Sequence, residues 1–383
     1  MNGPTGKILF VSNTSWSLTN FRRGLLRSLQ DDGWEVVTAA PEDDSSSRLG
    51  AEFNWIPVLH LERKGLNPGK DLLLLLELMR ILRSERPDLV VSFTIKPNIY
   101  TPVAARLVGA KCICSVTGLG YTFNRRSPLS RLVTLMYRTA FRLAARVGFQ
   151  NREDLALFTG GRIVPAEKAF LTPGSGVDLE RFSQHDRTAG GDAPDGMRFL
   201  FAGRMLREKG VGEYAAAARA VRRKHGSAVF QLLGPLDPGN PGGIGQETIR
   251  SWEAEGSLRY MGETEDVRPF LAEADAVVFP SYYREGIPRI LLEAAAMGKP
   301  IITTDSVGCR EVVDQGVNGF LVPPRDAEAL TETLFRFIGM GDAERSLMGE
   351  RSRRKAERDF DERIVIALYK DAICDALERN RVL

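Results

Sequence analysis

The sequence predicts an α/β protein with two domains in series, each built on a parallel sheet. The chain has 383 residues, more than one typical core needs and enough for two domains of about 150–200 residues. Short apolar runs alternate with longer stretches of helical spacing, which is typical of parallel strand–helix units. A loop rich in Gly, Asp and Pro at 185–196 separates two such series. We therefore expect a first domain over 1–185 and a second over 186–362.

In the first domain, strands are expected at the short apolar runs and helices where apolar residues recur every three or four positions. The predicted strands are Lys7–Ser12, Glu35–Ala39, Trp55–Val58, Leu89–Thr94, Cys112–Val116, Val147–Gln150 and Ala169–Leu171. The helices expected between them include Phe21–Asp32, Lys70–Ser84 and Leu129–Arg146.

The same alternation predicts the sheet of the second domain. Its strands are expected at Met197–Ala202, Ala228–Leu233, Leu258–Met261, Ala276–Phe279, Pro300–Thr303 and Gly319–Val322. Its helices are expected at Gly212–His225, Ile249–Glu255, Val267–Glu273, Arg289–Met297 and Ala327–Ile338. A final helix at about 363–383 is expected to pack back on the first domain. Because open α/β sheets bind ligands at the carboxyl ends of their strands, we expect a cleft between the two domains.

Positive charge is concentrated in the first domain. From Leu89 to Arg152 the chain has no Asp or Glu but ten Lys or Arg. The part at 129–143 is mostly apolar, with arginines interleaved, and basic amphipathic stretches of this kind bind anionic bilayer surfaces. The alternative is a core helix whose arginines point to water. We expect membrane contacts from Arg125, Arg126, Arg131 and Arg138.

Cysteine usage and hydropathy indicate the compartment. The four cysteines form neither a metal-ligand spacing nor a disulfide framework, which favours a reducing cytoplasm. The N-terminus has no signal-peptide pattern, and no apolar run reaches the about 18–20 residues that cross a bilayer. The expected location is cytoplasmic, peripheral on the inner face of the cell membrane.

The strongest chemical signal follows the predicted strand Ala276–Phe279. Residues 281–298 read SYYREGIPRILLEAAAMG, which places Glu285 in a loop and Glu293 about one and a half turns into a helix beginning near Pro288. The free N–H groups at a helix N-terminus suit phosphate, and a carboxylate further along can accept hydrogen bonds from ribose hydroxyls. The alternative is a surface glutamate on an amphipathic helix.

A second signal lies at 199–210, which read FLFAGRMLREKG. Gly203 allows close backbone approach, Arg204 can bind phosphate oxygens bidentately, and Lys209 adds a compact charge. Together these groups can neutralise a diphosphate leaving group, which metal ions do in other transferases. Taken alone, the same residues also fit ordinary solvated cations. The sequence contains no zinc-ligand cluster, and its Asp-x-Asp at 359–361 is interpreted as a helix start, so we expect no metal.

Three stretches together resemble the retaining GT-B glycosyltransferases of the family four type. They are the Gly-Arg-x4-Lys-Gly stretch, the Glu-x7-Glu stretch and Gly176-Val177-Asp178-x3-Phe182. The resemblance covers essentially the whole chain. It implies a GT-B fold with two facing Rossmann-like domains, an interdomain active-site cleft, the nucleotide-sugar donor on the C-terminal domain and the acceptor on the N-terminal one.

By position, the resemblance implies that Arg204 and Lys209 bind the donor diphosphate and Glu293 the ribose. Glu285 is then the catalytic candidate beside the donor sugar. The full set of expected donor-binding residues is Gly203, Arg204, Lys209, Ile287, Pro288, Arg289 and Glu293.

A finer resemblance links Phe93–Tyr100, Val116–Tyr121 and Ser306–Glu311 to a bacterial subgroup. That subgroup adds N-acetylgalactosamine or a related hexosamine to undecaprenyl-diphosphate-linked sugars. Many relatives carry a His near the donor sugar, whereas here the backbone of Thr117–Gly120 is expected in that place. Lys96 is expected in a turn at the end of a buried strand, either as an acceptor contact or as a structural turn residue. The expected acceptor or cleft residues are Asn13, Thr14, Asn20, Lys96, Asn98, Thr117, Gly118, Leu119 and Gly120.

The sequence thus predicts a retaining, metal-independent transferase that needs no cofactor. Its expected donor is a UDP-hexosamine, most simply UDP-N-acetylgalactosamine, and its acceptor an undecaprenyl-diphosphate-linked saccharide, in O-antigen or other surface-polysaccharide biosynthesis or in glycoprotein-glycan assembly. An anionic membrane surface is an expected partner and nucleic acid is not. The alternatives are a UDP-sugar epimerase on a similar scaffold and a transferase for another UDP-hexose. A nicotinamide-dependent enzyme would need a Gly-x-Gly-x-x-Gly turn, which the first strands of both domains lack.

Overall fold

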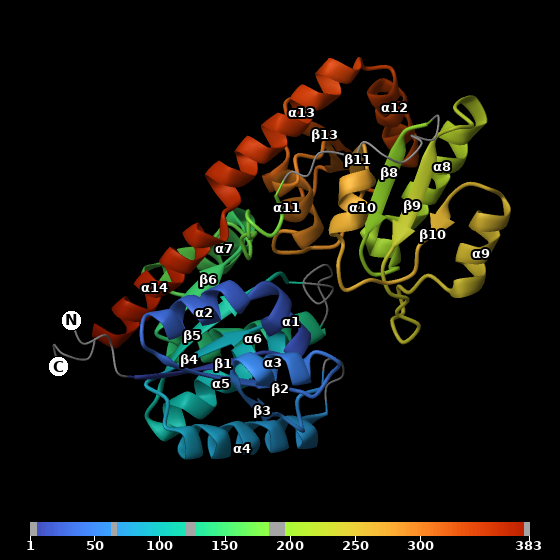
Figure 1. The fold of residues 1–383 in the computed structure, drawn as a ribbon. Helices are drawn as coiled ribbons and strands as arrows, with labels where there is room; N and C mark the ends of the chain where they lie inside the picture. The colour runs from blue at the N-terminus through green and yellow to red at the C-terminus, as the bar shows by residue number, and fades with distance from the viewer. Residues whose placement is uncertain (1–5, 63–66, 120–127, 184–195, 379–383) are drawn as a thin grey trace. The chain divides into compact units, whose positions relative to one another are not determined.

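The computed structural model describes residues 6–62, 67–119, 128–183 and 196–378, which divide into two compact units (Figure 1). Unit 1 comprises Met1–Gly176 and Glu362–Leu383, and unit 2 comprises Val177–Asp361. The expected boundary at 185 differs from this one because Val177, Leu179 and Phe182 pack into the hydrophobic core of unit 2.

Unit 1 is built on a parallel sheet, of which the described residues form seven strands in the order β3-β2-β1-β4-β5-β6-β7. The strands are β1 (Lys7–Val11), β2 (Glu35–Ala40), β3 (Asn54–Pro57), β4 (Leu89–Phe93), β5 (Lys111–Val116), β6 (Arg146–Phe149) and β7 (Ala169–Leu171). Strand order reverses between β1 and β4. In such sheets ligands bind at the carboxyl ends of the strands beside this switch point.

Helices cover both faces of this sheet. They are α1 (Ser15–Phe21), α2 (Arg23–Asp31), α3 (Ser46–Glu52), α4 (Pro68–Glu85), α5 (Ile95–Val108), α6 (Pro128–Leu143), α7 (Arg152–Gly160) and α14 (Glu362–Glu378), with a 3-10 turn η2 (Ala166–Lys168). Leu9 and Val11 pack with residues of α4, α5 and α6, whereas Ile8 and Phe10 pack with residues of α2 and α14. The C-terminal helix, expected at about 363–383, is α14, which lies beside α2 and β5 (Figure 1).

One helix prediction in unit 1 was confirmed and one placement was wrong. The helix predicted at Phe21–Asp32 is α2, and it is preceded by a separate helix, α1, which ends at Phe21. The two meet at Arg22, a buried residue whose guanidinium lies 4.4 Å from the centre of the Phe93 ring. Lys96 does not lie in a turn but in the first turn of α5. Pro97 follows Lys96 in this turn, where proline is tolerated because the first N–H groups of a helix lack helical partners.

Unit 2 contains a second parallel sheet, with six strands in its described part in the order β10-β9-β8-β11-β12-β13. The strands are β8 (Arg198–Ala202), β9 (Val229–Leu233), β10 (Arg259–Tyr260), β11 (Ala276–Phe279), β12 (Ile301–Thr304) and β13 (Gly319–Val322). The order again reverses, here between β8 and β11. Both units therefore have the topology of Rossmann-like domains.

The helices of unit 2 are α8 (Val211–Lys224), α9 (Gln246–Ala254), α10 (Arg268–Glu273), α11 (Arg289–Ala296), α12 (Ala327–Ile338) and α13 (Asp342–Lys355), with 3-10 turns η3 (Arg207–Lys209) and η4 (Arg310–Val312) and a π-helical turn η5 (Ala356–Phe360). Helix α8 packs against α12, and α11 packs against α13. Since β8 connects to β9 and β11 to β12 in opposite directions, right-handed crossovers put α8 and α11 on opposite faces of the sheet.

Candidate active site

Two loops at the carboxyl ends of neighbouring strands carry the predicted donor residues of unit 2. The loop after β8 contains Gly203, Arg204 and η3, and the loop after β11 leads to Glu285. They are joined by a hydrogen bond of 2.9 Å from the Tyr282 backbone N–H to the Glu208 carbonyl. Gly210 ends η3 with φ 79°, and a Cβ there would collide with the Pro280 carbonyl. Glycine is therefore what allows these two loops to meet.

Lys209 and Glu285, which the sequence placed separately, form an ion pair. The side chains are only 10% and 18% exposed, and Ser281 Oγ donates a hydrogen bond of 3.3 Å to Glu285. Lys209 Nζ also lies 5.2 Å from the centre of the Phe279 ring and 5.6 Å from that of Tyr283. The ammonium group is thus held at the base of the loops, with its charge balanced by the candidate catalytic carboxylate.

Arg204 is paired in the same way, with a carboxylate that sequence reasoning missed. Its Nη1 lies 3.2 Å from Asp237 Oδ2, and Asn240 Nδ2 donates to the same oxygen over 3.1 Å. Asp237 belongs to the loop after β9, which is fixed to the Arg204 loop by a 3.0 Å bond from Met205 N–H to the Pro235 carbonyl. Its one sequence signal was an acidic residue in a Gly-Pro loop that follows a strand.

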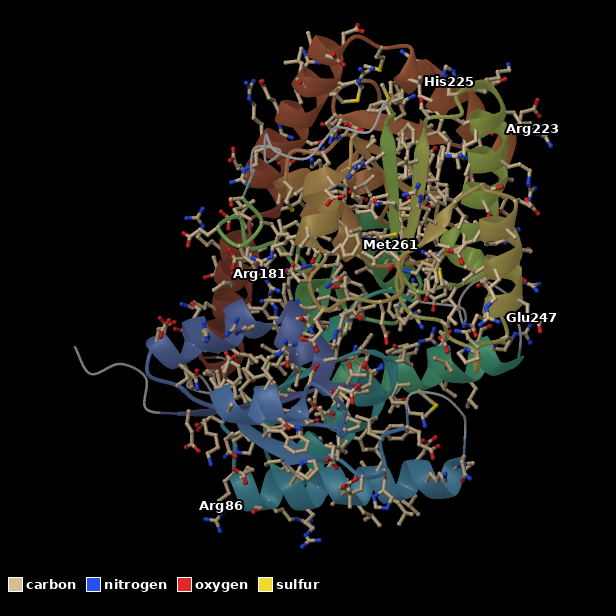
Figure 2. All side chains as sticks on the ribbon, turned by 45° about the vertical axis from the view of Figure 1, so that its right-hand side comes forward. Arg86, Arg181, Arg223, His225, Glu247 and Met261 are labelled. Atoms are coloured by element: carbon tan, nitrogen blue, oxygen red, sulfur yellow. The ribbon has the colours of Figure 1, made fainter. Side chains whose placement is uncertain are left out.

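Glu293 lies on α11, where Arg289 Nε donates a 2.9 Å hydrogen bond to its Oε1. Burial raises the pKa of Glu293, while the charges of Arg289 and Arg181 lower it. Arg181, labelled in Figure 2, belongs to the Gly176–Phe182 stretch and was not among the predicted site residues. Burial outweighs the two arginines, so the pKa of Glu293 lies above the ordinary glutamate value.

The remaining donor predictions are placed as follows. Pro288 is the N-cap of α11, with φ −61° and ψ 124°, so the helix begins at Arg289, as predicted. Ile287 is buried in the core of unit 2, so only its backbone can face a ligand. Gly203 is partly exposed, and a Cβ there would lie 3.2 Å from Phe279 Cε2.

In unit 1, three predicted acceptor segments follow neighbouring strands of the sheet. Asn13 and Thr14 follow β1, Lys96 opens α5 after β4, and Thr117 and Gly118 follow β5. Since parallel strands end at the same edge, the fold brings these segments together there.

Asn98 corrects one prediction. Its side chain is fully buried, its Oδ1 accepts from Ser92 Oγ over 2.8 Å, and its Nδ2 donates to the Ser115 carbonyl over 2.8 Å. It links β4 to β5 and has no surface for an acceptor. Lys96 is ion-paired with Asp71 of α4 at 2.7 Å. Burial and a hydrogen bond to Asp71 raise the pKa of Tyr100, so Asp71 connects two side chains of α5.

Other predicted contacts have local structural roles. Thr14 caps α1 by accepting from the Ser17 N–H over 3.1 Å, and Asn20 Nδ2 donates to the Trp16 carbonyl. Leu119 is buried in the core, so its side chain is a core residue and not a ligand contact. Gly118 has φ 124°, which favours glycine. Gly120 lies outside the described residues.

The basic helix α6 has one buried stripe and one mixed outer face. Val133, Tyr137 and Phe141 are buried, whereas Leu132 and Leu135 are 51% and 56% exposed beside the exposed Arg131. Arg138 instead donates to the carbonyls of Gly161 and Arg162 at the end of α7. Arg125 and Arg126 lie outside the described residues. Within the described ranges, no helix is both long enough and apolar enough to span a bilayer.

Comparison with known proteins agrees with this division into two units. Residues 7–151 match the family Glycosyl transferase 4-like, and residues 196–339 match the family Glycosyl transferases group 1. The chain is 27% identical to the N,N'-diacetylbacillosaminyl-diphospho-undecaprenol alpha-1,3-N-acetylgalactosaminyltransferase of Campylobacter jejuni. The 385 aligned residues cover 97% of this chain and 94% of that protein. It is 26% identical to the UDP-Gal:alpha-D-GlcNAc-diphosphoundecaprenol alpha-1,3-galactosyltransferase of Escherichia coli, over 76% of each chain.

Solved structures show the same fold along nearly the whole chain. The sucrose-phosphate synthase of Thermosynechococcus elongatus has a TM-score of 0.78 and 18% identity, covering 97% of this chain and 99% of that one. Anabaena Alr3699/HepE in complex with UDP-glucose has a TM-score of 0.76 and 16% identity, covering 96% and 99%. Taken with the two family matches, these findings show that the chain belongs to the GT-B glycosyltransferases, with a glycosyl transferase 4-like domain followed by a glycosyl transferases group 1 domain.

Proposed function

We propose that the chain transfers a hexosamine, N-acetylgalactosamine, from its UDP donor to a hydroxyl of an undecaprenyl-diphosphate-linked saccharide. The observation that carries this proposal is the likeness to the Campylobacter jejuni N-acetylgalactosaminyltransferase, which extends over 97% of this chain and therefore over both units. An acceptor of this kind belongs to the assembly of bacterial surface or glycoprotein glycans.

The donor is proposed to bind at the loops after β8 and β11 of unit 2. The ion pairs of Arg204 with Asp237 and of Lys209 with Glu285 place two cations there. When the donor binds, the charged oxygens of its diphosphate replace the carboxylates of Asp237 and Glu285 as partners of the two cations. Charge-assisted hydrogen bonds from Arg204 and Lys209 then stabilise the diphosphate. Because these groups can neutralise the leaving diphosphate, we propose that no metal ion is needed.

Transfer is proposed to retain the configuration of the anomeric carbon. The acceptor hydroxyl attacks that carbon on the face from which the diphosphate departs. The bond between the carbon and the diphosphate oxygen breaks as the new glycosidic bond forms, and the hydroxyl proton passes to the departing oxygen. In this scheme Lys209 turns to the diphosphate, and Glu285 is left to orient the donor sugar and to stabilise positive charge that develops on it.

The acceptor is proposed to use unit 1, at the edge formed by the ends of β1, β4 and β5. The outer face of α6, with Arg131, Leu132 and Leu135, suits an anionic bilayer surface. A lipid-linked acceptor requires such contact, so we propose that the protein works as a peripheral protein on the inner face of the membrane.

A donor screen tests the proposal. UDP-N-acetylgalactosamine, UDP-N-acetylglucosamine, UDP-galactose and UDP-glucose are each incubated with synthetic polyprenyl-diphosphate mono- and disaccharides, with and without EDTA. We expect fastest transfer from UDP-N-acetylgalactosamine, an α-linked product by NMR, and no loss of rate with EDTA. Glu285→Ala should lower turnover by orders of magnitude with a modest loss of donor affinity. A product of inverted configuration would contradict the retaining mechanism. Inhibition by EDTA that a divalent cation reverses would contradict metal independence.

A second candidate is a galactosyltransferase, favoured by the likeness to the Escherichia coli enzyme over 76% of this chain. In the same screen it would use UDP-galactose faster than the N-acetylated donor. Incubation of each UDP-sugar without acceptor separates both transferases from an epimerase, because only the epimerase would convert the sugar.

A further inference from the structure

Unit 2 has a groove that the proposed donor site does not use. It has a volume of about 430 Å3 and lies between the first turns of α8 and α12 and the loops after β8 and β11. Arg207, Glu213, Tyr282 and Arg325 provide its polar groups. None of the donor candidates lines it, and α11, which carries Glu293, packs on the opposite face of the sheet from α8.

The two arginines of the groove differ from the cations of the donor loops because neither forms an ion pair with a carboxylate of the described residues. Arg207 and Arg325 are exposed, and neither guanidinium makes a hydrogen bond or ion pair with the residues that the structure describes. Arg325 lies 4.6 Å from the centre of the Tyr282 ring, with φ 62° in the left-handed region. This conformation is unfavourable for a residue other than glycine, so the fold presents Arg325 at some cost.

Glu213 is the acidic group of the groove, and burial raises its pKa while Arg325 lowers it. With two cations against one carboxylate, the groove carries net positive charge and favours an anion. Its volume is in the range of small-molecule sites, larger than a lone phosphate needs. Ala216 and Ile244 add apolar surface, and the Glu213 carboxylate and Tyr282 hydroxyl can hydrogen-bond to sugar hydroxyls.

The groove is lined in part by the same two loops that carry the proposed donor residues. Arg207 belongs to the same 3-10 turn as Lys209, and Tyr282 precedes Glu285 by three residues. The 2.9 Å hydrogen bond from the Tyr282 N–H to the Glu208 carbonyl joins these two walls. A ligand in the groove therefore contacts the segments that hold the Lys209–Glu285 pair.

We propose that this groove is a second saccharide site, which binds a sugar that carries an anionic group. The anion is held between Arg207 and Arg325. The sugar ring lies against Tyr282, Glu213 and the apolar surface of Ala216 and Ile244. A carboxylate of a uronic acid and a phosphate ester of a sugar have the required chemistry in common. The site requires neither the donor nor the acceptor assigned above.

Calorimetric titration of the full-length protein tests the site. The probes are glucuronic acid and glucose 6-phosphate, with glucose and inorganic phosphate as matched controls that lack either the anion or the sugar. We expect at least one anionic sugar to bind saturably and at least tenfold more tightly than both controls. The tighter of the two anionic sugars identifies a uronate or a sugar phosphate as the natural anion.

Variants then locate the binding. Arg207→Gln and Arg325→Gln should each weaken it at least tenfold, and Arg325→Lys should restore part of it. Arg223→Gln, at the far end of α8 (Figure 2), and Arg204→Gln, at the donor loop, should leave it unchanged. Thermal melting shows which variants are folded; if one of the two groove variants does not fold, the other alone decides.

Three results would overturn the proposal. One is no saturable binding of either anionic sugar, and another is equal binding of inorganic phosphate, which would make the groove a simple anion site. The third is loss of binding in Arg204→Gln with full binding in folded groove variants, which would place the probe at the donor loop. Because no probe contains a nucleotide or a lipid, failure here leaves the proposed transfer reaction untouched, and failure of the reaction leaves this test valid.

Discussion

Both cations of the predicted diphosphate clamp are neutralised by carboxylates, Arg204 by Asp237 and Lys209 by Glu285. Lys209 is more buried than Arg204. Burying its positive charge without Glu285 as a partner would destabilise the fold. The pairs therefore hold both cations in place. A diphosphate that binds here, as proposed, must compete with the two carboxylates, so its affinity would reflect the difference between the two sets of interactions.

Arg204→Ala should weaken UDP binding about 10- to 100-fold, since a hydrogen bond to a charged group contributes about 1.5–3 kcal/mol. Arg204 is partly exposed, so the fold should tolerate the change. Titration calorimetry with UDP measures the effect. Arg223→Ala, on the same unit but at the end of α8, is the control and should bind UDP like the parent. Equal affinities for both variants would remove Arg204 from the donor site.

The pKa of Glu293 gives a prediction for pH. Burial raises this pKa above the ordinary glutamate value, so the carboxylate takes up a proton at a higher pH than an exposed glutamate does. Protonation removes an acceptor for ribose hydroxyls, and UDP binding should therefore weaken as pH falls through the raised value. The phosphates of UDP also titrate. Glu293→Gln controls for them: UDP affinity of this variant should be lower at neutral pH and depend less on pH.

At the scale of elements, α6 is predicted to be the membrane contact of unit 1. A basic residue near an anionic surface contributes about 1 kcal/mol, so Arg131→Glu should remove about 2 kcal/mol, roughly a thirtyfold loss of binding. Flotation with vesicles that contain anionic lipid measures the membrane binding of the parent protein and of Arg131→Glu. Vesicles of neutral lipid should bind little of either one. Arg223→Glu makes the same charge change on unit 2 and should float normally. Unchanged flotation of the α6 variant would contradict the prediction.

At the scale of the whole molecule, α14 follows unit 2 in the sequence yet completes the core of unit 1. Tyr369 of α14 is fully buried, and its hydroxyl lies 2.6 Å from Ser115 Oγ of β5. Tyr369→Ala should lower the free energy of unfolding of unit 1 by about 3–5 kcal/mol, the range for large-to-small changes at buried aromatic residues.

Tyr369→Phe is the matched control, which loses only the hydroxyl and about 1 kcal/mol. Urea unfolding followed by circular dichroism compares the two variants. Because the predicted donor residues belong to unit 2, UDP binding by the folded Tyr369→Ala protein should match that of the parent. A loss of UDP affinity in this variant would show that the donor site depends on unit 1.

The sequence by itself determined the α/β class and the described strands of both sheets, and it predicted the stretches that we propose to carry the donor chemistry. Buried parallel strands are short continuous apolar runs, so β8 and β11 were predicted to within a residue. Gly203, Arg204 and Lys209 could be proposed as donor residues because they lie in the loop that follows such a strand. Helices α1, α3, α5, α7 and α13 were not among the helices assigned from the sequence. In α5, Pro97 and Pro102 obscure the helical pattern, because proline usually interrupts a helix.

Only the tertiary structure decided which side chains meet. The pairs Lys209–Glu285 and Arg204–Asp237 join residues from different loops, and the groove joins Arg207 to Arg325 from opposite ends of unit 2 in the sequence. Burial also separated Asn98, which ties β4 to β5, from the acceptor residues with which sequence had grouped it. The physical reason is that charge pairing and burial depend on distances between segments remote in sequence, which spacing along the chain does not encode.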